Sequence, residues 1–277
     1  MNHPVLRAQN LRRTYGTRAA LRDVSFDIRP GERVALLGAS GSGKSTLIRC
    51  LSGLETTDAG TGRIEVFGRP LQVGGRNSAD IRALRRRIGV IFQQFNLVGR
   101  LGVMNNVLTG LAADAPLWRG LLGRYTLEQR ARALDALHTI GLAPQAFQRA
   151  STLSGGQQQR AAIARVLVQG AELVLADEPV ASLDPQSTLR VMDQLAALNR
   201  DAGLTLVISL HQVSLARRYC HRVLALRDGE LVYDGPSAAL TASFLQQLYG
   251  TAAEELLHDD HDFAAPAAEA PPLALVA

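Results

Sequence analysis

A glycine-rich segment near the start of the chain has the residue types and spacing of a phosphate-binding loop. It fits the pattern G-x-x-x-x-G-K-[ST] and consists of Gly38, Ala39, Ser40, Gly41, Ser42, Gly43, Lys44, Ser45 and Thr46. Glycines let backbone N–H groups curve around phosphate oxygens, and a following helix directs the positive end of its dipole at them. In this pattern the lysine reaches the β- and γ-phosphates of a nucleotide and the hydroxyl of Ser45 binds Mg²⁺.

Lys44 is unusual in the composition as well as in the motif. The chain has 30 basic residues, of which Lys44 is the only lysine and 29 are arginines. A compact ammonium on a flexible stem is not interchangeable with a planar guanidinium. We interpret the single lysine as a position that a guanidinium does not fit.

A second segment supplies the acidic groups that nucleotide hydrolysis requires. Asp177 and Glu178 directly follow the apolar run 173–176. Asp177 would hold Mg²⁺ through water, and Glu178 would polarise the attacking water as a general base. Two acids after a strand are more often a solvated strand end than a catalytic site, but a phosphate-binding motif in the same chain favours the catalytic interpretation.

The elements that must position these groups are those of an α/β fold. Over residues 1–250, short apolar runs alternate with helical patterns, which is typical of a mainly parallel sheet with helices on its faces. Residues 33–37 predict a strand directly before the glycine-rich loop, and 173–176 and 205–208 predict two more. The opening part is richer in strands, for example at 24–28.

A long helical segment interrupts this alternation. A helix is predicted from Ser78 to Arg87 and a strand at 88–92, after which strand signals vanish over about 95–170. Helical patterns dominate there, most clearly at 126–140. We therefore predict one ATPase-type domain over 1–250 with a helical subdomain inserted at about 95–170.

The end of the chain has two recognisable features. Asp228 and Gly229 lie between the apolar runs 222–226 and 231–233 and predict a hairpin turn. Residues 251–277 are rich in alanine, proline and acids, and we expect them to be disordered. Histidines and aspartates at 258–262 could be written as a metal cluster, but a solvated tail is the more ordinary interpretation.

A third motif links the chain to a known family. Leu153-Ser154-Gly155-Gly156-Gln157 resembles the signature motif of ABC ATPases, which separates them from other phosphate-loop proteins. Physically it is a second anion site, because the serine and the small glycines open a helix whose N–H groups can face a phosphate. The resemblance covers about residues 5–250 and implies the ABC ATPase fold, with an N-terminal antiparallel β subdomain, and the cofactors ATP and Mg²⁺. It also implies a head-to-tail dimer of two copies, in which each signature contacts the γ-phosphate held by the other copy.

The remaining landmarks of the family occur in the expected order. Tyr15 resembles the aromatic residue that stacks on adenine, and Gln93 the glutamine that senses Mg²⁺ and water, although Gln94 stands beside it. Asp184 matches the loop that touches the partner subunit. His211 resembles the histidine that contacts the γ-phosphate. Singly, a histidine at a strand end is more often structural than catalytic, but the spacing of His211 from Glu178 fits the family.

The helical insert resembles the ATPases of phosphonate importers. The similarity lies in 94–101, 106–110 and 118–123, and in the run that starts at Ala176 and ends at Asp184. It implies uptake of phosphonate, or of a related oxyanion such as phosphite, through a separate membrane permease, with an extracytoplasmic solute-binding protein as an indirect partner. We expect the permease to dock at 95–100. The alternative is a non-transport ABC ATPase, for example a component of a cytoplasmic phosphonate-degrading complex.

Composition sets limits on where such a protein works. The formal net charge is +5, but 6 of the 25 acids lie in 251–277 with no basic residue, which leaves 19 acids against 30 basic residues, or +11, on 1–250. Such a charge suits nucleic acid, anionic lipid or a phosphorylated ligand alike; from the family, we expect no nucleic acid.

No apolar stretch approaches the roughly 18 to 20 residues of a membrane span, the start is unlike a signal peptide, and the two cysteines form no motif. We expect a peripheral protein on the cytoplasmic face of the inner membrane.

Overall fold

The computed structural model describes residues 3–112 and 125–250. Its centre is a six-stranded sheet with the order β11-β10-β3-β9-β8-β7, in which the first pair is antiparallel and the others are parallel. The strands are β3 (Arg33–Leu37), β7 (Ile88–Ile91), β8 (Leu173–Ala176), β9 (Thr205–Ser209), β10 (Arg222–Arg227) and β11 (Glu230–Pro236). Parallel pairing places the carboxyl ends of β3, β8 and β9 at one edge, where an open α/β sheet binds its ligands.

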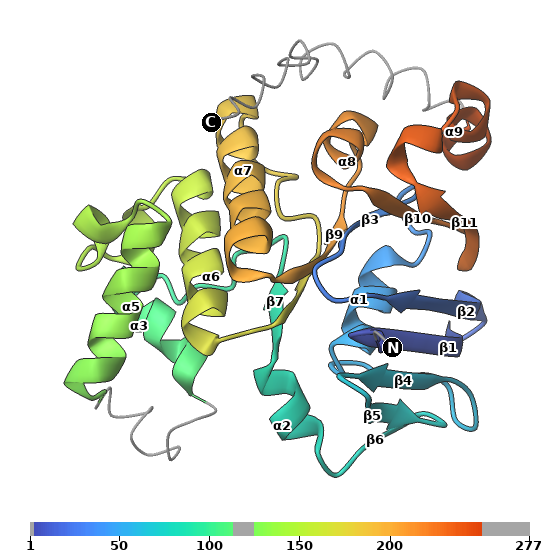
Figure 1. Cartoon of the computed structure of the whole chain (residues 1–277), viewed down its shortest axis with the longest axis horizontal. Helices are drawn as coiled ribbons and strands as arrows, with labels where there is room; N and C mark the ends of the chain where they lie inside the picture. The colour runs from blue at the N-terminus through green and yellow to red at the C-terminus, as the bar shows by residue number, and fades with distance from the viewer. Residues whose placement is uncertain (1–2, 113–124, 251–277) are drawn as a thin grey trace, which may run out of the picture.

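A second sheet lies beside the first and is antiparallel. Its order is β2-β1-β4-β5-β6, and Figure 1 shows it at the lower right. Its strands are β1 (Leu6–Tyr15), β2 (Arg18–Ile28), β4 (Arg63–Val66), β5 (Arg69–Val73) and β6 (Arg76–Asn77). The expected N-terminal antiparallel sheet is therefore present.

The helices form two groups. Within the described residues, α3 (Val103–Leu108), α5 (Leu127–Thr139) and α6 (Gly155–Gln169) lie between β7 and β8 in the chain and gather on the left of Figure 1. The others are α1 (Lys44–Leu51), α2 (Ile81–Arg86), α7 (Pro185–Ala202), α8 (Val213–Tyr219) and α9 (Ala242–Tyr249). Short 3₁₀ turns occupy 109–111, 143–145, 150–152 and 237–239.

The central sheet is buried on both faces, which explains its continuous apolar strands. In β3, Val34 and Leu36 belong to the core shared with the antiparallel sheet and α1, whereas Ala35 and Leu37 belong to the core under α6, α7 and α8. This alternation follows the two-residue period of a strand. The strand that precedes the glycine-rich loop is thus anchored from both sides.

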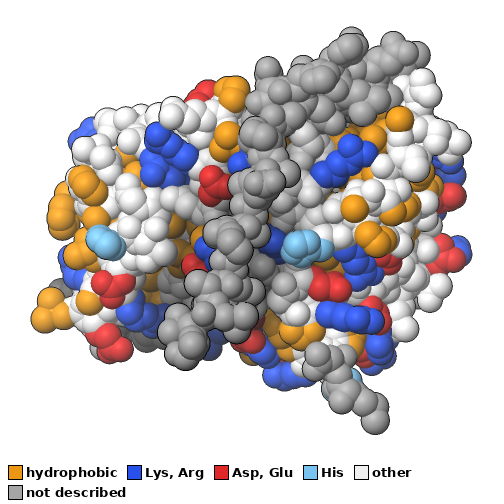
Figure 2. Space-filling model, turned by 45° about the horizontal axis from the view of Figure 1, so that its top comes forward, with side chains coloured by type: hydrophobic (Ala, Val, Ile, Leu, Met, Phe, Trp, Pro, Cys, Tyr) orange, Lys and Arg blue, Asp and Glu red, His pale blue; other side chains and the backbone are white. Residues whose placement is uncertain are grey.

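Several local predictions agree with the observed elements. The predicted strand 173–176 is β8, and the predicted turn at Asp228 and Gly229 joins β10 to β11. The helix predicted from Ser78 begins at Ile81 instead, because the N–H of Ser78 still donates to Leu71 O in the antiparallel sheet (2.9 Å). None of the helices within 3–112 and 125–250 combines the length and the apolar composition of a membrane span. On the face in Figure 2, basic, acidic and hydrophobic side chains are interspersed.

The predictions for residues 118–123 and 251–277 lie outside the described residues. They include the expectation that 251–277 is disordered and the two interpretations of the histidines and aspartates at 258–262.

Candidate active site

The glycine-rich loop joins β3 to α1, in the order that the sequence predicts. Lys44 begins α1 and its side chain is only 4% exposed. Its Nζ donates to the carbonyl oxygens of Gly38 (2.7 Å) and Ala39 (3.2 Å), so the loop wraps around the ammonium. Burial lowers the pKa of Lys44, and the nearby carboxylates of Glu178 and Asp177 oppose that shift. The positive charge is thus held at the loop by both hydrogen bonds and acids.

Asp177 directly follows β8, which β9 separates from β3 in the sheet, and it faces the start of α1. Its Oδ1 accepts a hydrogen bond from Ser45 Oγ (3.1 Å) and another from Ser209 Oγ (3.1 Å). Burial raises the pKa of Asp177, although both hydroxyls lower it by stabilising the carboxylate. A buried carboxylate beside a hydroxyl is a suitable pair of oxygen ligands for Mg²⁺, directly or through water. Among the described residues no larger group of metal-binding side chains occurs.

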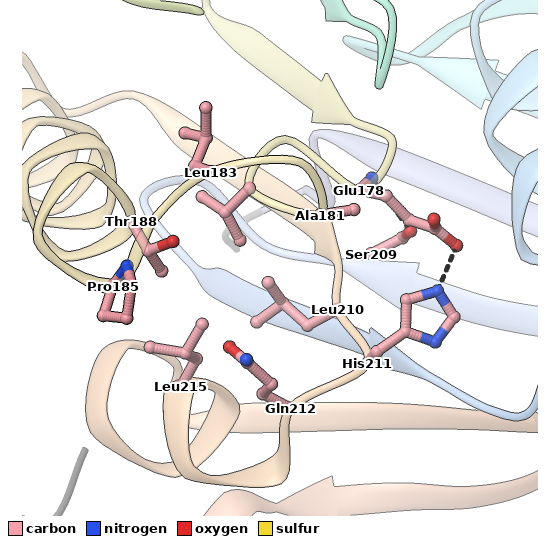
Figure 3. Close-up of a pocket in the computed structure, with 11 residues that line it drawn as sticks. Glu178, Ala181, Leu183, Pro185, Thr188, Ser209, Leu210, His211, Gln212 and Leu215 are labelled. Atoms are coloured by element: carbon pink, nitrogen blue, oxygen red, sulfur yellow. Dashed lines mark hydrogen bonds and ion pairs between the residues drawn. The ribbon is translucent and has the colours of Figure 1, made fainter. Parts of the chain in front are cut away.

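Glu178 lies next to Asp177 with an unusual backbone. Its φ is +48°, in the left-handed region that costs a non-glycine residue energy. Its N–H donates to Ser209 Oγ (3.2 Å), so one serine holds both acids. Its Oε1 lies 2.6 Å from His211 Nε2 and 3.9 Å from Lys44 Nζ. A dashed line in Figure 3 marks the contact with His211. The strained turn therefore directs the carboxylate between the lysine and the histidine.

An open cavity of about 600 Å³ brings together Lys44, Glu178 and His211. It is lined by Tyr15, Arg18, Ala20, Ser40, Gly41, Gly43, Lys44, Ser45, Thr46, Gln93, Glu178 and His211. The volume lies in the range of small-molecule sites. Gln93 is part of the lining and its neighbour Gln94 is not, which favours Gln93 as the residue that faces a nucleotide.

The aromatic end of the cavity comes from the antiparallel sheet. Tyr15, the last residue of β1, is 42% exposed, and the guanidinium of Arg13 stacks on its ring at 4.7 Å. An exposed ring with one face supported by a cation leaves the other face available for a base. Arg18, at the start of β2, donates to the carbonyl oxygen of Gly41 (3.0 Å) and so supports the glycine-rich loop from the same sheet.

The Ser154–Gln157 motif forms a different site, away from this cavity. Ser154 caps α6: its Oγ accepts from the N–H of Gln157 (3.3 Å), and the Gln157 side chain accepts from the N–H of Ser154 (2.9 Å). This reciprocal cap satisfies two N–H groups and leaves those of Gly155 and Gly156 at the helix N-terminus. A helix start of this kind attracts an anion.

Asp184 lies beside that helix start rather than in the cavity. It caps α7 by accepting from the N–H of Ser187 (2.9 Å), which lowers its pKa. A Cβ on Gly156 would lie 2.7 Å from Ser187 Oγ, so only glycine permits α6 and α7 to approach this closely. The signature motif and Asp184 thus form one surface, separate from the cavity of the same chain.

The fold, the glycine-rich loop with its adjacent acids, and the capped start of α6 are together typical of one class of protein. The family model described as ABC transporter matches residues 21–181, more than half of the chain. The chain belongs to this family and is an ABC-type ATPase.

Curated relatives narrow the class. The chain is 59% identical over 255 residues to the phosphonates import ATP-binding protein PhnC 1 of Cupriavidus metallidurans, covering 92% of this chain and 90% of the relative. It is 53% identical to the phosphonates import ATP-binding protein PhnC of Paraburkholderia xenovorans, covering 92% and 85%. The solved ATP-binding cassette MJ0796, described as a dimeric post-hydrolysis state bound to ADP and Pi, is 32% identical with a TM-score of 0.71 and covers 85% of this chain and 100% of that one.

Sequence reasoning missed two side chains of the site. Ser209 bridges Asp177 and Glu178, and Arg18 supports the loop at Gly41. The signal that could have identified Ser209 is its position directly after the predicted strand 205–208 and two residues before His211. Nothing local marked Arg18.

Proposed function

We propose that this chain powers uptake of phosphonate, or of a related oxyanion such as phosphite, through a separate membrane permease. The proposed class of cargo rests on the sequence identity of 53% to 59% between this chain and curated phosphonate import ATP-binding proteins, over about nine-tenths of the chain. In this arrangement the chain lies on the cytoplasmic face of the inner membrane, and an extracytoplasmic solute-binding protein delivers the cargo to the permease.

The nucleotide is proposed to lie across the cavity from Tyr15 to the glycine-rich loop. Lys44 exchanges its contacts with Gly38 and Ala39 for oxygens of the β- and γ-phosphates. Ser45 and Asp177 would hold Mg²⁺, which would supply positive charge to neutralise the phosphates. Gln93, which also lines the cavity, would contact the metal and the attacking water.

Hydrolysis is proposed to depend on the contact between Glu178 and His211. The carboxylate of Glu178 takes the proton of the attacking water, while His211, 2.6 Å from Glu178 Oε1, orients that carboxylate and contacts the γ-phosphate. The 3.9 Å from Lys44 Nζ keeps Glu178 beside the phosphate-binding ammonium.

A second copy of the chain is proposed to complete each site. The motif residues Ser154, Gly155, Gly156 and Gln157 do not line the cavity of their own chain, so a phosphate that binds the N–H groups at this helix start must be held elsewhere. Two copies arranged head to tail supply it, with Asp184 at the contact. The dimeric form of the solved cassette MJ0796 supports this arrangement.

The base assignment is tested with Glu178→Gln. A general base contributes about 10²- to 10⁴-fold, so we expect ATPase activity to fall by at least about 100-fold while ATP binding remains and a closed dimer accumulates in size-exclusion chromatography. Glu172→Gln is the matched control, because Glu172 pairs with Arg87 near the other end of β8. Normal turnover in Glu178→Gln would exclude Glu178 as the base.

The permease is proposed to dock at 95–100, beside a groove of about 960 Å³. The groove is lined by arginines of α2 and α6, including Arg82, Arg85 and Arg165, and by Phe92 and Asn96. Arg165 donates to the carbonyl oxygens of Asn96 (2.7 Å) and Phe95 (3.4 Å), so it fixes this loop to α6. Both native cysteines are buried. A cysteine introduced at the exposed Asn96 should therefore crosslink to the permease, and one at Glu230 on the β10–β11 hairpin should not; equal crosslinking would contradict the docking site.

The cargo is tested by reconstitution. The chain is combined with its permease and solute-binding protein in vesicles, and ATPase activity is measured with phosphonate, phosphite and phosphate. Stimulation by phosphonate or phosphite supports the proposal. Recovery of the chain from cells with a soluble phosphonate-degrading complex, and without a polytopic membrane protein, would contradict it.

A further inference from the structure

The last described helix reaches the first glycine of the phosphate-binding loop. Tyr249 ends α9, is only 9% exposed, and its hydroxyl accepts a hydrogen bond from the N–H of Gly38 (3.2 Å) across 211 positions of sequence. Burial raises the pKa of Tyr249 to about 12, so the phenol is neutral at physiological pH. None of the proposed catalytic steps uses this residue.

Gly38 has a backbone that only glycine adopts. Its φ is +148°, and a Cβ would lie 2.3 Å from Leu226 O and 2.6 Å from Ser42 Oγ. A glycine has no side chain to fix its two flanking peptides, so hydrogen bonds must do so. The N–H of Gly38 donates to Tyr249, and the carbonyl oxygen of Gly38 accepts from Lys44 Nζ (2.7 Å).

Helix α9 is itself firmly placed against the central sheet. Leu245 and Leu248 are buried, and the ring of Phe244 packs on that of Tyr233 of β11 with centroids 5.1 Å apart. Arg227, at the end of β10, donates to Gln247 O near the helix C-terminus (3.2 Å). Figure 1 shows α9 beside β10 and β11. The tyrosine hydroxyl is therefore presented to the loop from a fixed support.

We propose that Tyr249 is a positioning residue for nucleotide binding, which sets the conformation of the phosphate-binding loop through the N–H of Gly38. When Lys44 leaves the Gly38 carbonyl for a phosphate, the hydrogen bond to Tyr249 is the side-chain contact that still holds Gly38. The docking of α9 and the binding of ATP are then coupled, and such coupling is reciprocal. The proposal rests on the proposed nucleotide site.

The test compares Tyr249→Phe with two other hydroxyl deletions. Tyr249→Phe keeps the ring and leaves the buried N–H of Gly38 without a partner. Tyr233→Phe removes the hydroxyl that donates to Pro236 O (2.8 Å), and Tyr219→Phe the one that donates to Asp193 Oδ1 (2.7 Å). Both control hydroxyls bond elsewhere than the loop, so these variants report the cost of losing a tyrosine hydrogen bond alone.

We expect Tyr249→Phe to weaken ATP binding and raise KM about 3- to 10-fold, as the loss of one backbone hydrogen bond implies, with kcat little changed. The loop binds the phosphates equally in the ground state and the transition state. Weakening it therefore raises KM and leaves kcat unchanged. The controls should lower the melting temperature without this effect on KM. If Tyr249→Phe changes only the melting temperature, as they do, the residue is merely structural and the proposal is wrong.

Two further measurements keep the outcomes separate. Lys44→Ala is included because, if it binds ATP like the unmodified chain, the nucleotide site itself is wrong and the inference falls with it. Hydrogen exchange on the unmodified chain needs no variant to fold: ATP should slow amide exchange in α9 together with the loop at 38–46. Protection of the loop with no change in α9 would overturn the proposed coupling.

Discussion

Ser209→Ala is the sharpest test of how the two acids are held. Ser209 is fully buried, and its single hydroxyl donates to Asp177 Oδ1 (3.1 Å) and accepts from the N–H of Glu178 (3.2 Å). The substitution removes both hydrogen bonds and almost no volume. Glu178 would then keep its left-handed backbone, at φ +48°, without the hydrogen bond that stabilises it.

The magnitude follows from the two hydrogen bonds that the alanine cannot make. A buried donor left without a partner costs about 1 to 3 kcal/mol. If the whole cost is expressed as misplacement of the Glu178 carboxylate, kcat falls by roughly 5- to 150-fold, since about 1.4 kcal/mol is tenfold in rate. We expect a decrease of about tenfold, with the rest appearing as a lower free energy of unfolding.

The pH dependence of kcat should change in a definite direction. The Ser209 hydroxyl stabilises the Asp177 carboxylate and lowers its pKa against the opposing effect of burial. Without that hydroxyl the pKa of Asp177 rises further. The carboxylate then becomes protonated, and loses its affinity for a cation, at a higher pH, so the acid limb of the profile should move to higher pH.

Thr205→Val is the matched control for this experiment. Thr205 begins the same strand, is 1% exposed, and its hydroxyl accepts from the N–H of Gly31 (3.0 Å). Both substitutions thus leave one N–H without its acceptor, but only Ser209 touches the acids. Steady-state ATPase assays and thermal unfolding are measured on both variants. If the two lose stability alike and kcat is unchanged in both, Ser209 does not hold the acids in their catalytic positions.

Three further substitutions have defined outcomes. Asp177→Asn should abolish Mg²⁺-dependent hydrolysis yet raise the free energy of unfolding near pH 7 by roughly 0.5 to 2 kcal/mol. Burial raises the pKa of this acid above its ordinary 3.8, so the ionised carboxylate destabilises the fold, and this loss of stability grows as pH rises through the shifted pKa. Chemical denaturation at pH 4 and pH 7 measures the difference. Lys44→Arg should weaken ATP binding at least about tenfold in calorimetry, because a larger planar group replaces a side chain that is only 4% exposed. Unchanged affinity would show that charge alone suffices. Gly156→Ala should retain ATP binding but lose ATP-dependent dimerisation in light scattering, because its Cβ would lie 2.7 Å from Ser187 Oγ, and adding Ser187→Gly should restore the dimer.

Much of the fold was predictable because its signals are local. The strand 173–176 is a continuous apolar run between polar residues, and Asp228 with Gly229 suits a tight turn between two strands, so both were predicted at their observed positions. Ser154 with Gln157 three residues later is a capping box in sequence and in structure.

The connections between distant segments were not predictable in this way. Strand β9 pairs with β8, which brings Ser209 to Asp177, and β3 pairs with β10, which brings the end of β10 to Gly38. Periodicity shows that a strand is buried but not which strand is its neighbour. Serine and tyrosine are also common at the ends of elements, so neither Ser209 nor Tyr249 was distinguishable from a residue that merely completes a hydrogen bond. The roles assigned to the site residues from the sequence stay predictions.

The left-handed backbone of Glu178 has a consequence for how such chains diverge. An asparagine or a glycine adopts a φ of +48° at less cost than glutamate does. If Glu178 is the general base, as proposed, hydrolysis requires a glutamate at this position even though replacing it would stabilise the fold. In a duplicated copy that no longer needs to hydrolyse ATP, we expect this position to be among the first to be substituted. A glycine or asparagine after the aspartate would therefore identify a cassette that binds nucleotide but has lost catalytic activity.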